Sequence, residues 1–359
     1  MPEAKLKIVK SLTFSILVII IFFGGLEFSL RIKGFRYERR LSYLEFGYPN
    51  RKELHQVFEL DQKLIFRMKP GYDFGLGFKP LNQQGFYGDD FKQEKPEGVL
   101  RIACLGDSVT FGRPEGNYPE ILKEILNQAG LGKEFQVYNF GVPGYSSWQG
   151  KNLLGMVLKE YKPDWVIISY VWNDHWRARG FSDSEQVLRS EPTLVKFRDL
   201  ISYLRIYQLV NWSMVKLGVS AGEEKFRVPI NEYRENLKEM VEMGKNGGAK
   251  IIFATAPSGI GLAQLPDYFE HLGFLKKGDS LPELHNQYNQ VLLKVAKEQG
   301  VEILDLDLLF QKNGVKNFFD HPDKDIIHPN RKGLELMAEA ISEIVIQELK
   351  EDLKKEGKK

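Results

Sequence analysis

Two patterns of hydrophobic residues divide the chain. Close to the N-terminus, Ser11 to Leu26 is an uncharged run of 16 residues, mostly Ile, Leu, Val and Phe, so a helix there would be apolar on every side. From residue 97, short apolar runs alternate with longer amphipathic stretches. This alternation predicts an α/β fold in which helices connect parallel strands by right-handed crossovers. The expected strands lie near residues 99–105, 135–140, 164–171, 250–256 and 301–305, and the expected helices over 117–129, 148–159, 231–245, 281–299 and 332–350.

Two insertions interrupt the alternation. Residues 177–229 follow the third expected strand, and residues 258–280, which are rich in glycine, follow the fourth. In the first insertion, apolar residues recur at roughly helical spacing with Lys and Arg between them, which predicts an amphipathic helix. Such a helix either covers the core or lies on a membrane surface. Covering the core is the commoner arrangement, and we expect it here.

The apolar N-terminal run predicts an uncleaved signal anchor. It is slightly shorter than the ~20 residues that span a bilayer, and Glu27 near its end would reach the interface. No small-residue cleavage motif follows it, which argues against a cleaved signal peptide. No cysteine follows it directly either, which argues against a lipid-anchored form. A buried core helix is the other alternative.

The composition narrows the classes of function. With 359 residues, of which 43% are apolar, the chain is long enough for one large domain and an appendage. A formal net charge of +2 gives no reason to expect a nucleic-acid partner. Cys104 is the single cysteine, so no intramolecular disulfide is expected, and no Cys/His cluster has zinc spacing. We therefore expect neither a metal nor a cofactor.

A serine at the end of the first expected strand is the first candidate for chemistry. The apolar run before Gly106 ends in a sharp turn, which places Ser108 at the carboxyl edge of the sheet. Far downstream, Asp325 precedes His328 by three residues, so the carboxylate can hold the imidazole in the tautomer that a serine nucleophile requires. A metal site is the alternative for this segment, built from Asp320, His321, Asp323, Asp325 and His328.

Four short blocks of the chain resemble those of the SGNH (GDSL) hydrolase family, in the family's order and near its usual spacing. They are Gly106-Asp107-Ser108, Gly144 within Asn139-Phe-Gly-Val-Pro-Gly-Tyr145, Asn173 within Val171-Trp-Asn-Asp174, and Asp325-x-x-His328. Val171 stands where the third block usually has glycine. The resemblance covers residues 97–350, about seven-tenths of the chain.

The resemblance implies a fold and a site. The fold is a three-layer α/β/α, flavodoxin-like arrangement with a five-stranded parallel sheet in the order 2-1-3-4-5. The catalytic triad is Ser108 as nucleophile, His328 as general base and Asp325 as the carboxylate that orients it. The oxyanion hole comprises the backbone N–H groups of Ser108 and Gly144 and the side-chain amide of Asn173. These residues follow strands one, two, three and five, so we expect them at one edge of the sheet.

The activity implied by the resemblance is that of a serine esterase that hydrolyses an oxygen ester through an acyl-enzyme. The expected substrate is an acylated carbohydrate or envelope glycan that carries acetate. A lysophospholipase or other lipid esterase and an acyltransferase are alternatives that use the same triad. An alternative of another class is a non-catalytic envelope or glycan-binding module. The oligomeric state does not follow from the sequence.

The expected organisation is a single-pass membrane protein. Its segments are a tail (1–10), the anchor (11–30), a lead-in that packs along the main domain or forms an irregular stalk (31–96), the hydrolase domain (97–350) and a charged tail (351–359). Three lysines precede the anchor and five basic residues follow it, so the positive-inside rule places the domain in the cytoplasm. Resemblance to anchored bacterial members of the family favours the extracytoplasmic side, which we expect.

Overall fold

The computed structural model describes residues 2–37, 54–75, 77–179, 181–186, 193, 197, 200–217, 224–271 and 274–356. The chain forms two compact units. The smaller unit contains residues 1–40 and 191–222, and the larger unit contains residues 41–190 and 223–359.

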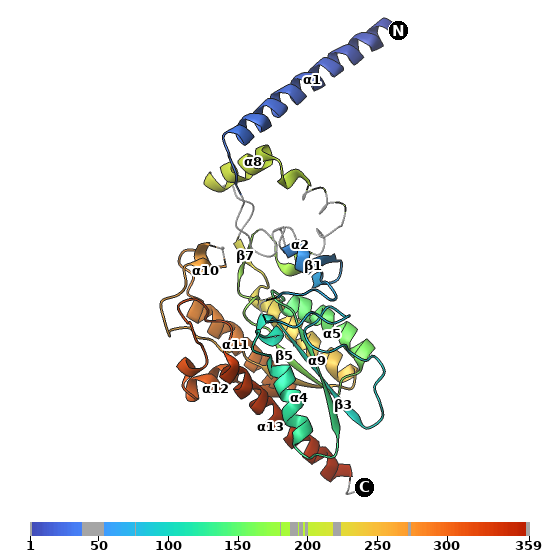
Figure 1. Ribbon diagram of the computed structural model, residues 1–359, viewed down its shortest axis with the longest axis vertical. Helices are drawn as coiled ribbons and strands as arrows, with labels where there is room; N and C mark the ends of the chain where they lie inside the picture. Colours follow the sequence, from blue (N-terminus) through green and yellow to red (C-terminus); the bar gives the residue numbers. More distant parts are fainter. Residues whose placement is uncertain are drawn as a thin grey trace. The chain divides into compact units, whose positions relative to one another are not determined.

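A five-stranded parallel sheet forms the centre of the larger unit (Figure 1). Its strands are β3 (Val99–Gly106), β4 (Glu134–Gly141), β5 (Trp165–Ser169), β8 (Lys250–Ala254) and β9 (Glu302–Leu304). Their spatial order is β4-β3-β5-β8-β9, which confirms the expected order 2-1-3-4-5. Gly106 at the end of β3 is in register with Gly141 of β4 and Ser169 of β5, so these three strands end together.

Helices cover both faces of the sheet. Those between and after the strands are α4 (Tyr118–Gln128), α5 (Ser147–Tyr161), α9 (Ile230–Asn246), α11 (Leu281–Gln299) and α13 (Arg331–Glu356). In Figure 1, α4 packs beside α13, and α5 packs beside α9, which also contacts α11. With right-handed crossovers, this strand order places α4 and α13 on one face and the other three on the opposite face. The three-layer α/β/α fold is therefore confirmed.

Short elements complete the larger unit. Before the sheet come α2 (Leu54–Val57) and the antiparallel strands β1 (Phe58–Asp61) and β2 (Ile65–Met68). Strands β6 (Arg177–Arg179) and β7 (Glu224–Phe226) pair at the base of the first insertion, and α6 (Asp183–Gln186) follows β6. The second insertion contains α10 (Tyr268–His271), and α12 (Leu306–Lys312) and the 3₁₀ helix η2 (Val315–Asn317) precede the Asp325–His328 segment.

The lead-in packs against the main domain from residue 57 onward rather than forming an irregular stalk. Phe66 is fully buried, and its carbonyl accepts a hydrogen bond of 2.6 Å from the Tyr145 hydroxyl. The Gln149 side chain donates to the carbonyl of Leu64 at 3.1 Å. These bonds satisfy polar groups in the interior, which makes the lead-in part of the core.

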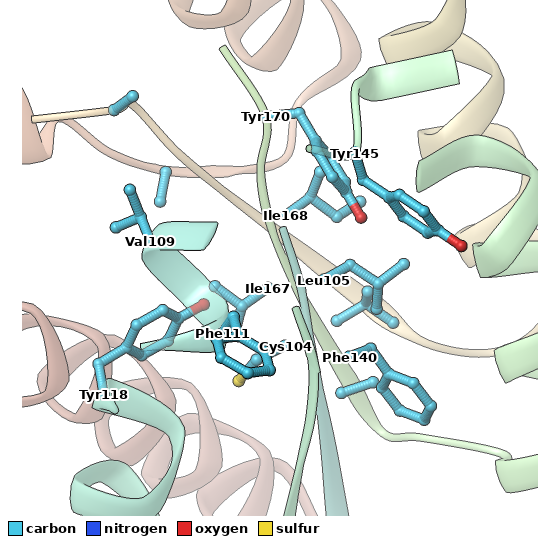
Figure 2. Close-up of a cluster of buried hydrophobic side chains, with 14 of the residues drawn as sticks. Cys104, Leu105, Val109, Phe111, Tyr118, Phe140, Tyr145, Ile167, Ile168 and Tyr170 are labelled. Carbon is cyan, nitrogen blue, oxygen red and sulfur yellow. The ribbon is translucent and has the colours of Figure 1, made fainter. Parts of the chain in front are cut away.

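Buried side chains from the first three strands support the turn that carries Ser108 (Figure 2). Phe111 of helix α3 (Ser108–Phe111) lies close to Cys104 of β3 and Tyr118 of α4, and Val109 comes from the same helix. Cys104 is completely buried, and burial raises the pKa of its thiol. It acts as a small core residue, as expected from its position in the strand.

The smaller unit joins the N-terminal helix to part of the first insertion. Helix α1 (Pro2–Ile32) packs against α8 (Arg205–Lys216). The expectation that the amphipathic helix of this insertion covers the sheet is therefore wrong, because α8 belongs to the unit of α1. Helical spacing reveals that one face of a helix is apolar, but it does not say which partner covers that face.

Candidate active site

A sharp turn at the end of β3 positions the candidate nucleophile. Asp107 caps helix α3, and its carboxylate accepts a hydrogen bond of 2.9 Å from the backbone N–H of Val109. Ser108 is the first residue of that helix. A Cβ atom at Gly141 would collide with the backbone nitrogen of Phe111, so glycine there lets α3 approach β4 closely.

The Asp325–His328 segment forms the second half of the site. One carboxylate oxygen of Asp325 accepts the backbone N–H groups of Ile327 and His328 at 3.0 and 3.1 Å. The other carboxylate oxygen lies 3.0 Å from Nδ1 of His328. Burial alone would raise the pKa of Asp325, but the hydrogen bonds and charge of His328 outweigh it, and the pKa falls to about 2. Asp325 is therefore ionised at neutral pH.

The two halves meet in a continuous chain of hydrogen bonds. Nε2 of His328 lies 2.7 Å from Oγ of Ser108, although the two residues are 220 positions apart. With Nδ1 facing the carboxylate, the proton of a neutral imidazole resides on Nδ1 and Nε2 is free to accept a proton from the serine. The side chains of His328 and Asp325 are partly exposed, so a substrate has access to them. The geometry is that of a nucleophile, a general base and an orienting carboxylate.

The expected oxyanion donors follow the neighbouring strands. Gly144 lies in a tight turn in which the N–H of Tyr145 donates to the carbonyl of Val142 at 3.1 Å. Its φ of +86° is the left-handed conformation required at the third position of a type II turn, with Pro143 before it. The side-chain amide of Asn173 donates to the carboxylate of Asp107 at 3.3 Å. Asp107 directly follows β3 and precedes Ser108.

Two residues beside the expected oxyanion donors are Asp107, which has a shifted pKa, and Val171, which stands in place of the family's usual glycine. Burial raises the pKa of Asp107 to about 6, although the hydrogen bond from Val109 opposes this shift. Because the same carboxylate accepts the side-chain amide of Asn173, it links the nucleophile turn to Asn173. Among the described residues, a positive φ outside glycine occurs at Ile65 and Lys162, so the backbone at Val171 does not require the glycine usual in that block.

Asp174, the residue after Asn173, belongs to a buried network of polar side chains. Asp174 is completely buried and accepts the backbone N–H of Ser147 at 2.9 Å. Burial raises its pKa to about 8, against the hydrogen bonds from Ser147. Nearby, Arg227 pairs with Asp183 at 2.8 Å, and both side chains are buried. The network fixes the start of α5 and the loop that follows β5.

Arg113 is a site residue that the sequence analysis missed. Its Nη1 donates to the carbonyl of His328 at 2.9 Å and lies 3.7 Å from the Asp325 carboxylate. Arg331 makes a second connection, donating to the carbonyl of Glu115 at 3.1 Å. Both arginines join the segment after α3 to the Asp325–His328 segment. The only signal in the sequence was that Arg113 is five residues from Ser108, which does not specify a partner 215 positions away.

The second insertion borders the site. The N–H of Gly259 donates to the carbonyl of Ile326 at 2.8 Å. Burial, with the nearby charge of Asp325, raises the pKa of Tyr268. This insertion therefore holds the backbone of the Asp325–His328 segment at Ile326, and it contributes an aromatic side chain close to Asp325.

The metal alternative finds no support in the geometry. Asp325 and His328 bond to each other, and Asp320 accepts the side-chain amide of Asn330 at 2.7 Å. Over the part of the chain that the structure describes, no three His, Cys, Asp or Glu residues come together as a metal-binding group.

A comparison with known families decides the identity of the main domain. The model of the GDSL-like lipase/acylhydrolase family matches residues 104–336. The chain belongs to this family. The matched region extends from the core of β3 to the first turns of α13, so it includes the nucleophile turn and the Asp325–His328 segment. The resemblance noted from the four sequence blocks is confirmed.

Two curated relatives and one solved structure illustrate the range of similar proteins. An acetylxylan esterase of Xylanibacter ruminicola is 25% identical over 293 residues, which cover 76% of this chain and 49% of the relative. An uncharacterised esterase of Bacillus subtilis is 23% identical over 186 residues, which cover 50% of this chain and 44% of the relative. A lipase/acylhydrolase of Enterococcus faecalis, 18% identical, aligns with a TM-score of 0.43 over 69% of this chain and 95% of its own. The chain spans about half the length of the curated relatives it matches.

Proposed function

We propose that the protein is a serine esterase that cleaves an oxygen ester through an acyl-enzyme. The observation that carries the proposal is the chain of hydrogen bonds from Ser108 through His328 to Asp325, with distances of 2.7 and 3.0 Å. Membership of the GDSL-like lipase/acylhydrolase family supports it.

The reaction follows from the roles that the geometry permits. Nε2 of His328 takes the proton of Ser108 while Oγ attacks the ester carbonyl, and Asp325 stabilises the imidazolium that forms. The backbone N–H groups of Ser108 and Gly144 and the amide of Asn173 stabilise the oxyanion. His328 then donates its proton to the leaving alcohol. Water attacks the acyl-enzyme by the same route and releases the acid and Ser108.

The proposed substrate is an acetylated carbohydrate. Support comes from the similarity to an acetylxylan esterase, although the two sequences are only 25% identical. Release of acetate from acetylated xylan or from an O-acetylated envelope glycan is the direct assay. Faster hydrolysis of lysophospholipids or long-chain esters than of acetyl esters would contradict this substrate and favour the lipid esterase.

Anchoring of the enzyme in a membrane is the second part of the proposal. Residues Lys7–Ile32 of α1 are long and apolar enough to span a bilayer, and none of them is buried by the rest of the chain. A signal sequence meets the same criterion, so mass spectrometry of the mature N-terminus is the test. We place the catalytic domain on the extracytoplasmic side, which protease protection in spheroplasts would check.

The nucleophile is tested by labelling. The full chain is incubated with a fluorophosphonate and with p-nitrophenyl acetate and butyrate, beside Ser108→Ala and His328→Ala. We expect both variants to lose hydrolysis and labelling, with the phosphonyl group on Ser108 in the wild type. A folded wild type that neither labels nor hydrolyses either ester would instead indicate a non-catalytic glycan-binding module.

A further inference from the structure

Helix α8 is bonded to the C-terminal end of α1. The carboxylate of Glu27 on α1 accepts the backbone N–H of Ile206 at 3.0 Å, in the first turn of α8. Arg31, one turn further along α1, bonds to Glu27 at 2.8 Å and donates to the carbonyl of Tyr203 at 3.2 Å. Figure 1 shows α8 next to the C-terminal end of α1. A polar group at the end of α1 thus caps the start of α8.

The same side of α8 contacts the residues that follow α1. The side chain of Gln208, which is buried, accepts the N–H of Tyr37 at 3.2 Å. Trp212, one turn later, packs edge to face against Phe35, with ring centroids 6.3 Å apart. The buried Gln208 therefore marks the side of α8 that faces the rest of the smaller unit. Trp212 lies on the same side and packs against Phe35, but it remains 36% exposed.

The other side of α8 is apolar and exposed. Val210 is 50% exposed, Met214 38% and Leu217 76%. Their spacing of four and three residues places them on one face of the helix, away from Gln208 and Trp212. Exposed large apolar residues also precede the helix, namely Phe197, Leu200, Tyr203 and Leu204. Large apolar side chains that are exposed together on one helix face indicate an interaction site.

The charge around this apolar surface is positive. Residues 27–37 and 200–217 contain five basic side chains and one acidic side chain, Glu27, which pairs with Arg31. The basic ones are Arg31, Lys33, Arg36, Arg205 and Lys216. An apolar helix face with basic residues beside it is the pattern of a helix that lies in the headgroup layer of an anionic membrane.

The length of α1 places the junction at that layer. The apolar helix Lys7–Ile32 has 26 residues, which correspond to about 39 Å at 1.5 Å per residue. The hydrocarbon core of a bilayer is about 30 Å thick. Glu27 and Arg31, near the end of α1, are therefore expected at the headgroups when α1 spans the membrane, and α8 begins at that point.

We propose that α8 is a second membrane contact, lying in the headgroup layer of the leaflet that the C-terminal end of α1 reaches, with Val210, Met214 and Leu217 toward the acyl chains. Its occupant is an anionic phospholipid surface. This inference rests on the proposed spanning of the membrane by α1.

The test is depth-dependent quenching of single labels on the full chain. Cysteine replaces Met214, Ile16 of α1 or Leu308 of the hydrolase domain in separate variants, and each carries an environment-sensitive fluorophore. The buried Cys104 is retained, with the wild type as labelling control. The chain is reconstituted in phosphatidylglycerol/phosphatidylcholine vesicles that contain a nitroxide at a shallow or a deep position of the acyl chain.

We expect the shallow nitroxide to quench the Met214 label at least two-fold more than the deep one, and the deep one to quench the Ile16 label more. The Leu308 label stays unquenched. A Met214 label that behaves like the Leu308 label, with Ile16 quenched, overturns the inference and leaves the anchor intact. An unquenched Ile16 label overturns the anchor and the inference together.

The charge requirement has its own test. Vesicles of phosphatidylcholine alone, or the variant Lys216→Glu in mixed vesicles, should reduce quenching of the Met214 label at least two-fold. Lys312→Glu, the same charge change on α12 of the other unit, should have no effect. Quenching of the Met214 label that is equal in both kinds of vesicle, and equal in Lys216→Glu and Lys312→Glu, would overturn the anionic surface as the occupant.

Discussion

Replacement of Asp325 by asparagine tests whether this carboxylate sets the tautomer of His328. One oxygen of Asp325 is held by the backbone N–H groups of Ile327 and His328, so the asparagine carbonyl will take that position. The amide NH₂ then occupies the position 3.0 Å from Nδ1 of His328. There it faces Nδ1, which also lies 3.1 Å from the oxygen position that the asparagine carbonyl keeps. Donation from the amide at the shorter distance favours the tautomer with the imidazole proton on Nε2. Nε2 would then present a proton to Ser108 instead of a lone pair.

The expected loss can be worked from the structure. The substitution removes a charge-assisted hydrogen bond to the imidazolium that forms during the reaction, which is worth ~2–3 kcal/mol. Restoring the productive tautomer breaks one neutral hydrogen bond, which adds ~1 kcal/mol. The sum of ~3–4 kcal/mol corresponds to a fall in kcat of about 10²–10³-fold.

The assay is kcat for p-nitrophenyl acetate together with the rate of fluorophosphonate labelling, since both depend on deprotonation of Ser108. Asp323→Asn is the matched control, because it makes the same charge change at an exposed position of the same segment. We expect the control to keep wild-type kcat. A folded Asp325→Asn protein with kcat within ten-fold of the wild type would refute the role of Asp325 in setting the tautomer.

Three further predictions concern the surroundings of the triad. Asn173→Ala should lower kcat about 10²–10³-fold with little change in KM, because it removes a proposed oxyanion donor; an effect confined to KM would contradict that role. Arg113→Met should lower kcat and the labelling rate together by about ten-fold, as loss of its ~1–2 kcal/mol hydrogen bond to His328 loosens the base; unequal effects on the two rates would argue against positioning. In the folded protein the pKa of Asp174 is raised to about 8, so its carboxyl keeps a proton at neutral pH. In the unfolded chain the same carboxyl has its ordinary pKa of about 4 and releases that proton. The free energy of unfolding of the wild type should therefore fall as pH rises from about 4 to about 8. Thermal unfolding of Asp174→Asn should show a flatter pH dependence, and an unchanged slope would refute the protonated state.

Much of the fold followed from local pattern. The apolar runs of the first three strands are buried on both sides, so the strands and their parallel direction could be predicted from the alternation of strands and helices. Their order in the sheet, 2-1-3-4-5, followed from the resemblance to the SGNH family and not from the pattern. The boundaries were less certain: β5 ends at Ser169 rather than 171, because the chain turns there toward Asn173, and α13 continues to Glu356 beyond the expected 350. The lead-in left two alternatives open, which the contacts of Phe66 and Leu64 decide.

The sequence by itself determined the parallel sheet, the apolar N-terminal helix and the chemical types of the candidate triad, because each depends on residues within one short segment. The triad of Ser108, His328 and Asp325 was expected from the family resemblance, and the tertiary structure supplies the contact of 2.7 Å between His328 and Ser108. The tertiary structure alone decided that Arg113 bonds to the His328 segment and that α8 joins α1. These contacts join positions up to 220 residues apart. The physical reason is that local pattern specifies which face of an element is apolar or polar, whereas the partner of that face depends on how the whole chain packs.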